Sequence, residues 1–144
     1  MAKIQNYENH VRWNPLVHYV VTPLLLLNLI WQIAFLIQEP SWDRAAGTLL
    51  AVTLLLLSIG ARMQALTVQN RLIRLEETLR YKEILAPDLA EEARRLRTGQ
   101  IVALRFAPDE ELPELVRQTL GGQFQSNKEI KLAVKKWRGD YLRA

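Results

Sequence analysis

The chain has 144 residues, carries 19 Lys and Arg against 15 Asp and Glu for a net charge of +4, and contains no cysteine. Without cysteine, disulfide frameworks, thiolate nucleophiles and thiolate metal sites are excluded. Two long apolar blocks fall in the first half, whereas the second half is charged and basic. Because this asymmetry is typical of a chain with one end in lipid and the other in water, we predict an all-helical membrane protein.

Residues 1–15 form a polar N-terminal segment that is rich in aromatic side chains for a terminal tail. We expect it to lie at the membrane interface, because rings with one apolar and one polar end are enriched there. The residues expected to act as interfacial anchors are Tyr7, Trp13, Tyr19, Trp42 and Trp137.

Two histidines are the candidate cofactor ligands of the chain. His10 and His18 flank the start of the first apolar block, and neutral imidazole is a common ligand of haem, pigments and metals. Pro15 lies between them and interrupts any shared helical face, and no carboxylate or thiol completes a ligand set. Interfacial hydrogen bonding is the favoured alternative for both.

Residues 16–37 form a run of 22 residues without a charge. At about 1.5 Å per residue, such a helix covers the roughly 30 Å hydrocarbon core of a bilayer, which predicts a first span. Asn28 and Gln32 lie four residues apart on one face of this helix, and their amide groups would stay unpaired in lipid. We therefore expect helix–helix contacts there, with a pore lining as the alternative.

Residues 38–44 are expected to form a tight turn, because Pro40 disfavours helix at the residue before it. Residues 45–61 are again uncharged and predict a second, shorter span. Arg44 and Arg62 flank this span, and their long side chains can place the charges among the headgroups. The two spans together predict a transmembrane hairpin.

The distribution of Lys and Arg predicts the orientation of this hairpin, residues 16–61. Two of these residues precede the first span, one lies in the turn, and five follow the second span closely. Cytoplasmic segments near spans are enriched in Lys and Arg, so both termini are expected in the cytoplasm. The five that follow are Arg62, Arg71, Arg74, Arg80 and Lys82.

Residues 62–85 contain neither Pro nor Gly, so the second span is expected to continue into the cytoplasm as one helix. Apolar residues at alternating spacings of three and four give this helix an apolar seam, which either self-association or the chain's own tail would cover. Glu76 and Arg80 are expected to form an ion pair on a solvated flank. The seam residues are Ala65, Val68, Leu72, Leu75 and Leu79.

Residues 86–144 are expected to form a small cytoplasmic domain of short helices, each with its own start signal. Asp88 is expected to cap a helix that ends at Arg97. Thr98 is expected to cap a second helix through Phe106.

The middle of this tail carries a third start signal and one ambiguous run. Residues 108–111 place a proline and three acids in the expected first turn of a helix, which Gly121 and Gly122 end. Residues 101–104 are apolar enough for a strand, but the run is short and has no evident partner, so helix is preferred.

Ser126 and Glu129 form a capping-box pattern that predicts a last helix ending near Trp137. One side of this helix is apolar and includes Ile130 and Val134, and the other side is basic. Such a helix suits either a membrane surface or closure of the tail bundle, and both alternatives stay open. The residues expected to contact lipid headgroups are Arg44, Arg62, Lys128, Lys131, Lys135, Lys136 and Arg138.

The run QNYENHVRWNPLVHY at residues 5–19, the two apolar blocks and the terminal IKLAVKKWRGDYLRA carry a resemblance over nearly the whole chain. The chain resembles a bacterial family of short two-span membrane proteins known only as a domain of unknown function. The resemblance implies the same fold and a bacterial cytoplasmic membrane. It carries over no activity, ligand or catalytic residue.

Catalytic patterns are missing from the sequence. There is no nucleophile with a base, no phosphate-binding glycine loop and no regular set of metal ligands, so we predict a protein that is not an enzyme and holds no cofactor or metal. The acids Asp109, Glu110, Glu111 and Glu114 suit the first turn of a helix better than a cation site. Acids also interrupt every basic stripe of the tail, which argues against nucleic acid as a partner.

The sequence therefore predicts an accessory or scaffold subunit of a membrane complex, or a homo-oligomer. A self-associating small channel, lined by Asn28 and Gln32, is the first alternative. A haem- or pigment-binding subunit that uses His18 is the second. The expected partners are the lipid bilayer, its anionic headgroups, and other membrane subunits or copies of the chain itself.

Overall fold

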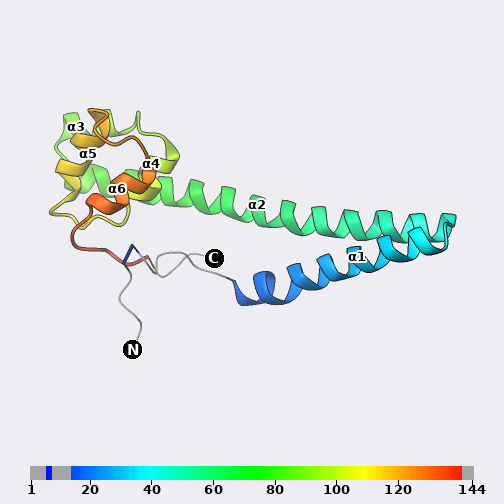
Figure 1. The fold of residues 1–144 in the computed structure, drawn as a ribbon. Coiled ribbons are helices and arrows are strands. Elements are labelled where there is room, and N and C mark those ends of the chain that lie inside the picture. The colour runs from blue at the N-terminus through cyan, green and yellow to red at the C-terminus, as the bar shows by residue number, and fades with distance from the viewer. Residues whose placement is uncertain (1–5, 8–13, 141–144) are drawn as a thin grey trace. The chain divides into compact units, whose positions relative to one another are not determined.

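The computed structural model describes residues 6–7 and 14–140, and within them all regular structure is helical (Figure 1). The all-helical class predicted from the sequence is confirmed for these residues. The chain divides into two compact units, Arg12–Leu66 and Met1–Val11 with Thr67–Ala144. We call them the hairpin unit and the tail unit, and each is described by itself.

The hairpin unit contains a short π-helical segment, η1 (Leu16–Val21), helix α1 (Thr22–Gln38) and the first part of helix α2 (Trp42–Ile84). The continuous helical stretch Leu16–Gln38 and helix α2 are both long and apolar enough to cross a membrane. Within this unit α1 and the first part of α2 lie side by side and run in opposite directions (Figure 1).

The wide turns of η1 lie just before Pro23, the second residue of α1. In a regular helix a proline ring clashes with the carbonyl group four residues earlier, which here belongs to Tyr19 inside η1. A π-helical turn leaves more room at that carbonyl. The helical stretch therefore passes the proline without ending.

The turn of the hairpin consists of Glu39, Pro40 and Ser41. Glu39 has φ −136° and ψ 82°, away from the helical region, as expected for a residue before proline. Ser41 Oγ accepts the backbone N–H of Arg44 at 3.3 Å and so satisfies a free donor at the start of α2. The Arg44 guanidinium donates to Glu39 Oε2 at 2.9 Å, which joins the two ends of the turn.

The tail unit packs four short helices against the C-terminal part of α2 within the described residues (Figure 1). The prediction of helix at residues 101–104 is confirmed, and so is the helix stop at Gly121 and Gly122. Gly122 has φ 72°, a left-handed conformation that glycine adopts without strain. The four helices are α3 (Pro87–Ala93), α4 (Thr98–Leu104), α5 (Leu112–Leu120) and α6 (Asn127–Ala133).

The predicted capping residues of α3 and α4 are wrong by one or two positions. Ala86 caps α3 and Pro87 opens it, because a proline in the first turn needs no N–H partner and has the helical φ. Arg97 caps α4 in place of Thr98, since Gln100 Oε1 accepts the Arg97 N–H at 2.9 Å. Both helices also end earlier than predicted.

The predicted start of α5 and end of α6 are also wrong, and Glu111 explains the second. Residues 109–111 form a turn, so α5 begins only at Leu112. The Glu111 carboxylate accepts the backbone N–H groups of Lys135 and Lys136 at 2.9 and 3.0 Å. These two bonds replace helical ones, so α6 ends at Ala133. The capping box that opens α6 at Ser126 is confirmed, with a 3.3 Å bond from the Glu129 N–H.

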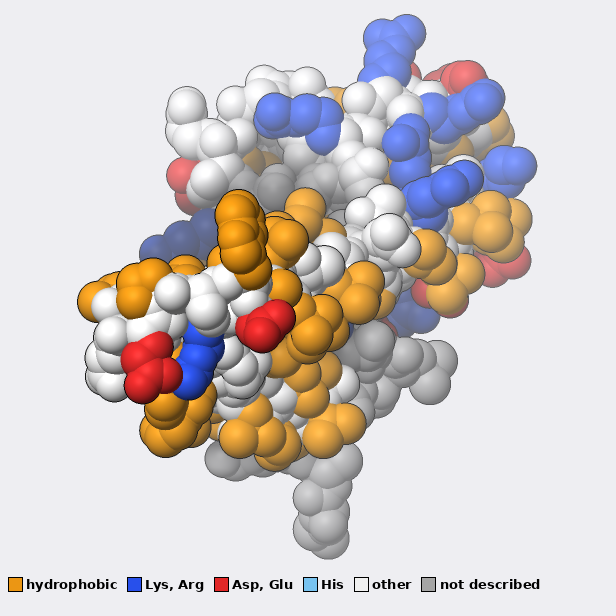
Figure 2. Space-filling view, turned by 90° about the vertical axis from the view of Figure 1, so that its right-hand side faces the viewer, with side chains coloured by type: hydrophobic (Ala, Val, Ile, Leu, Met, Phe, Trp, Pro, Cys, Tyr) orange, Lys and Arg blue, Asp and Glu red, His pale blue; other side chains and the backbone are white. Residues whose placement is uncertain are grey.

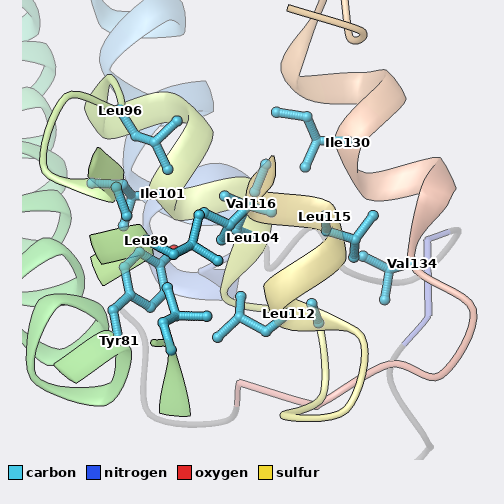
Figure 3. Close-up of a cluster of buried hydrophobic side chains, with 14 residues drawn as sticks. Tyr81, Leu89, Leu96, Ile101, Leu104, Leu112, Leu115, Val116, Ile130 and Val134 are labelled. Carbon is cyan, nitrogen blue, oxygen red and sulfur yellow. The ribbon is translucent and has the colours of Figure 1, made fainter. Parts of the chain in front are cut away.

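A single cluster of apolar side chains forms the core of the tail unit, with members from α2 and from all four short helices (Figure 3). Burying one such side chain fully contributes about 1.5–3 kcal/mol. The members labelled in Figure 3 are Tyr81, Leu89, Leu96, Ile101, Leu104, Leu112, Leu115, Val116, Ile130 and Val134.

The apolar side of α6 belongs to this core. Ile130 and Val134 are buried in the cluster, and Trp137 stacks on Phe106 with ring centroids 4.6 Å apart. This face is therefore already covered by protein. Of the two alternatives weighed above for the last helix, the structure has the closure of the tail bundle.

Candidate interaction surfaces

One of the two predicted in-span amides contacts the neighbouring helix within the chain. Gln32 lies opposite Gly47, where an added Cβ would come within 3.1 Å of Gln32 Oε1. The backbone oxygen of Gln32 accepts a bond from Thr48 Oγ1 at 3.3 Å. Asn28 instead is exposed on α1, and no described residue hydrogen-bonds to its amide. The hairpin therefore accounts for Gln32 and leaves the Asn28 amide without a protein partner in the described residues.

The close approach at Gly47 gives a prediction with a matched control. A Cβ added at Gly60 meets no atom within 4 Å, whereas one at Gly47 meets the Gln32 side chain. Gly47→Val is expected to separate the helices and to destabilise the hairpin by about 1–3 kcal/mol relative to Gly60→Val. Unfolding of the detergent-solubilised protein by SDS, followed by circular dichroism, measures the difference. Equal stability of the two variants would contradict the contact.

The predicted interfacial anchors have different surroundings. Trp42, the first residue of α2, and Tyr19 are exposed in the hairpin unit. The rings of Tyr7 and Trp137 meet edge to face in the tail unit, with centroids 6.4 Å apart. Trp13 lies outside the described residues. Tyr7 and Trp137 thus have packing partners in the tail, and Tyr19 and Trp42 stay predicted anchors.

The candidate ligand His18 is hydrogen-bonded at its Nδ1 to the backbone oxygen of Asn14, at 2.9 Å. Because a carbonyl oxygen only accepts, Nδ1 carries the hydrogen and donates it. This bond is an ordinary side-chain hydrogen bond, the alternative to ligand binding that was predicted for His18. The other candidate, His10, lies outside the described residues.

A buried ion-pair network joins α2 to the rest of the tail unit. Arg80 is 9% exposed and donates to Glu77 Oε2 at 3.0 Å, to Asp109 Oδ1 at 2.9 Å and to the Ala107 backbone oxygen at 2.7 Å. The predicted pair between Arg80 and Glu76 is wrong, because Arg80 turns into the tail and Glu76 stays exposed. Arg80 therefore holds one helix end to a distant loop.

Two further ion pairs extend this network. Arg105 is buried and forms an ion pair with Asp140 at 3.1 Å, while its guanidinium lies 4.5 Å from the centroid of the Phe106 ring. Arg138 approaches Glu77 Oε1 at 3.5 Å. Neither Glu77 nor Arg105 was predicted from the sequence to take part in a site. The sequence did contain one indication that Arg105 is buried, because it interrupts the otherwise apolar run of residues 101–107.

Burial gives Glu77 an unusual acid–base behaviour. It raises the pKa of the carboxyl above the ordinary 4.5, even though the adjacent Arg80 guanidinium lowers it. In the unfolded chain the pKa returns to its ordinary value. Between pH 4.5 and the raised pKa, the folded state therefore binds more protons than the unfolded state. Acidification through this window increases the contribution of Glu77 to the free energy of unfolding.

Glu77→Gln cannot ionise and should remove that contribution. The stability of the wild type minus that of Glu77→Gln is expected to grow as the pH falls through the raised pKa toward 4.5. Urea unfolding of the full-length protein in detergent, at a series of pH values, measures this difference. Glu91→Gln, at an exposed carboxyl, is the control. A difference that is independent of pH would contradict the role of burial.

The acidic cluster of the tail bonds mostly to the chain's own groups. Asp109 is paired with Arg80, and the Glu111 carboxylate accepts backbone N–H groups as described above. Glu114 lies 3.6 Å from the Arg117 guanidinium. These contacts give the acids structural partners.

The contacts predicted between the basic residues of the last helix and lipid headgroups stay predictions.

The part of α2 that belongs to the tail unit has two apolar faces, and the tail core covers one of them. Tyr81 and Leu85 belong to the tail core, and Ile73 is also buried on that side of the helix. The seam predicted from the sequence lies on the opposite face. The predicted alternative that the chain's own tail covers the seam is therefore wrong for the described residues. The seam residues of the tail unit are Val68, Leu72, Leu75 and Leu79, with exposed fractions of 65%, 54%, 58% and 53%.

These features define a small helical protein with a hairpin of two membrane-length apolar helices and a helical tail with a buried ion-pair network. The chain belongs to a family of unknown function, DUF6526, whose model matches residues 1–144. The resemblance to an uncharacterised family is thereby confirmed. No curated protein matches the chain. No solved structure matches it either.

Proposed function

We propose that this chain is an integral protein of the bacterial cytoplasmic membrane that acts without catalysis, as an accessory or scaffold subunit. Its hairpin crosses the bilayer twice, and its tail unit and both termini lie in the cytoplasm. The observation that carries the proposal is the exposed surface of the two apolar helices.

Large apolar side chains are exposed along both helices of the hairpin unit. Figure 2 faces the turn of the hairpin and shows apolar side chains gathered there, with few charged groups. Monomeric soluble proteins rarely expose contiguous apolar patches above a few hundred Å². Lipid can cover such a surface, because the backbone polar groups of a helix are already hydrogen-bonded within the helix. The residues exposed by more than half include Leu24, Leu27, Ile30, Trp31, Leu49, Leu50, Leu56 and Leu57.

The orientation rests on the basic residues near the spans. Arg44 is the one Lys or Arg in the turn between the spans, residues 38–44. Five Lys and Arg residues follow the second span within the continuous helix α2. The positive-inside rule then places the tail unit in the cytoplasm.

The role as a subunit rests on groups that still need protein partners. The Asn28 amide lies on an apolar helix and has no partner among the described residues, and an amide in lipid favours contact with another helix. The polar residues of the tail engage one another in structural pairs. Neither the pore nor the haem alternative gains a supporting contact, since Gln32 lies opposite Gly47 and His18 bonds to Asn14.

Flotation with lipid vesicles after alkaline carbonate extraction tests the membrane assignment. The full-length protein is expected to stay with the lipid fraction, as an integral protein does. Protease added outside intact spheroplasts should then leave the tail uncut, and cut it after lysis. Release into the aqueous fraction would overturn the proposal, and cleavage of the tail in intact cells would reverse the orientation.

A further inference from the structure

We infer that two copies of this chain pair through a short parallel coiled coil formed by the seam of α2, with Arg71 of each copy paired to Glu76 of the other. The inference rests on the proposed function, because insertion in one membrane sets the relative direction of the two helices. In this inference, the helix that packs on the exposed seam is α2 of a second copy of the same chain.

The spacing of the seam is that of a coiled coil. Val68 and Leu75 take the d positions of a heptad repeat, and Leu72 and Leu79 take the a positions. All four side chains are more than half exposed in a folded tail unit. Polar residues such as Arg71 flank the seam. The seam is therefore surrounded by water and not by lipid hydrocarbon. Pairing buries these side chains from water.

The tail core leaves the seam accessible to a partner helix. It packs against Tyr81, at a c position of these heptads, and Ile73 at a b position is buried as well. A helix approaching the a and d positions therefore meets α2 from the side that the core does not use. Folding of the tail unit and pairing through the seam are compatible in one helix.

The charges beside the seam specify a parallel pair. Arg71 occupies a g position and Glu76 the e position of the following heptad. In a parallel pair these two positions of opposite chains lie next to each other, so two Arg71–Glu76 pairs form by symmetry. Both residues are exposed and make no ion pair with any described residue of their own chain. An antiparallel pair sets g against g and e against e, and forms neither.

The membrane supplies the two conditions that so short a seam requires. Copies inserted in the same orientation present parallel α2 helices, which is the direction that the charges favour. About two heptads are marginal for association in free solution. Confinement to one bilayer raises the effective concentration of the copies. Pairing is therefore expected in membranes and should weaken when the protein is diluted with lipid.

Disulfide trapping tests the seam directly, because the chain contains no cysteine of its own. Leu75→Cys places a thiol at the centre of the seam, and Arg74→Cys places one on the neighbouring exposed position away from it. Purified protein in vesicles of phosphatidylcholine and phosphatidylglycerol is oxidised with copper phenanthroline. A covalent dimer is expected for Leu75→Cys and not for Arg74→Cys. Equal trapping of the two variants, or none, overturns the inference.

Charge reversal tests the direction of the pair. In the Leu75→Cys background, Arg71→Glu or Glu76→Arg alone sets like charges side by side. Each should shift half-maximal trapping to about tenfold higher protein density in the bilayer. The double variant with both reversals restores the opposite pairs and should trap like the parent. Failure of the double variant to recover, with unchanged circular dichroism, overturns the parallel pair.

The two proposals fail in different ways. If the protein floats with the vesicles but shows no trapping specific to the seam, the membrane assignment stands and the homodimer is overturned. If trapping in native membranes yields a product with a different protein in place of the dimer, the seam serves another helix and the second copy is overturned. If the protein remains in the aqueous fraction, both proposals are overturned.

Discussion

Replacing Arg80 with alanine is expected to lower the free energy of unfolding of the tail unit by about 3–5 kcal/mol. The substitution removes a guanidinium that is 9% exposed and bonds to Glu77, Asp109 and the Ala107 backbone. It leaves the Glu77 carboxylate buried, with the more distant Arg138 at 3.5 Å as its remaining ion-pair partner among the described residues and Arg105 as a further nearby charge. Such a loss exceeds that of an exposed pair several-fold, because an uncompensated charge stays inside the protein.

Arg94→Ala is the matched control for this experiment. Arg94 pairs with Glu91 at 2.9 Å in the same i, i+3 arrangement, but the two side chains are 66% and 71% exposed. Its loss should change stability by no more than about 0.5 kcal/mol. Urea unfolding of both full-length variants in detergent, followed by circular dichroism at neutral pH, gives the comparison. Similar stability of the two variants would mean that the network contributes little.

Leu104→Ala is the second change with a large expected effect. Leu104 is fully buried in the tail core, where side chains of α3, α5 and α6 also converge (Figure 3). Truncation removes the buried methyl groups and leaves a cavity that close-packed neighbours fill only in part. The free energy of unfolding of the tail unit should fall by about 2–5 kcal/mol.

Leu132→Ala makes the same chemical change at a side chain that is 55% exposed on α6. It should stay within about 0.5 kcal/mol of the wild type, since little apolar surface is returned to water. Thermal unfolding of the three proteins at one detergent concentration ranks them. A wild-type melting temperature for Leu104→Ala would show that this cluster does not hold the tail together.

The long helices were predictable because their signals are strong and local. An uncharged run of membrane length predicts a span whatever the rest of the chain does, and Pro40 fixes the turn between the two helices. The seam at Leu72 and Leu75 was also visible as a spacing. The sequence left open which partner covers it, and the structure excludes the tail because the core uses the opposite face.

The helix ends and the buried charges were not predictable in this way. The end of α6 depends on Glu111, which lies far from it in the sequence and takes the N–H groups of Lys135 and Lys136. Arg80 was assigned to a solvated flank because a neighbouring Glu76 suited a helical pair. Its actual partners include Asp109, brought close only by the fold. Local patterns carry no information about such distant contacts.

Within the tail unit, the two opposite faces of α2 separate the surface used for folding from the surface proposed for association. If the chain pairs as proposed, mutations at Leu72 or Leu75 are expected to change association, whereas mutations at Tyr81 or Leu85 are expected to change folding. Substitutions in the seam could therefore change which helix the chain pairs with. The tail unit would still fold, because its core uses other residues of α2.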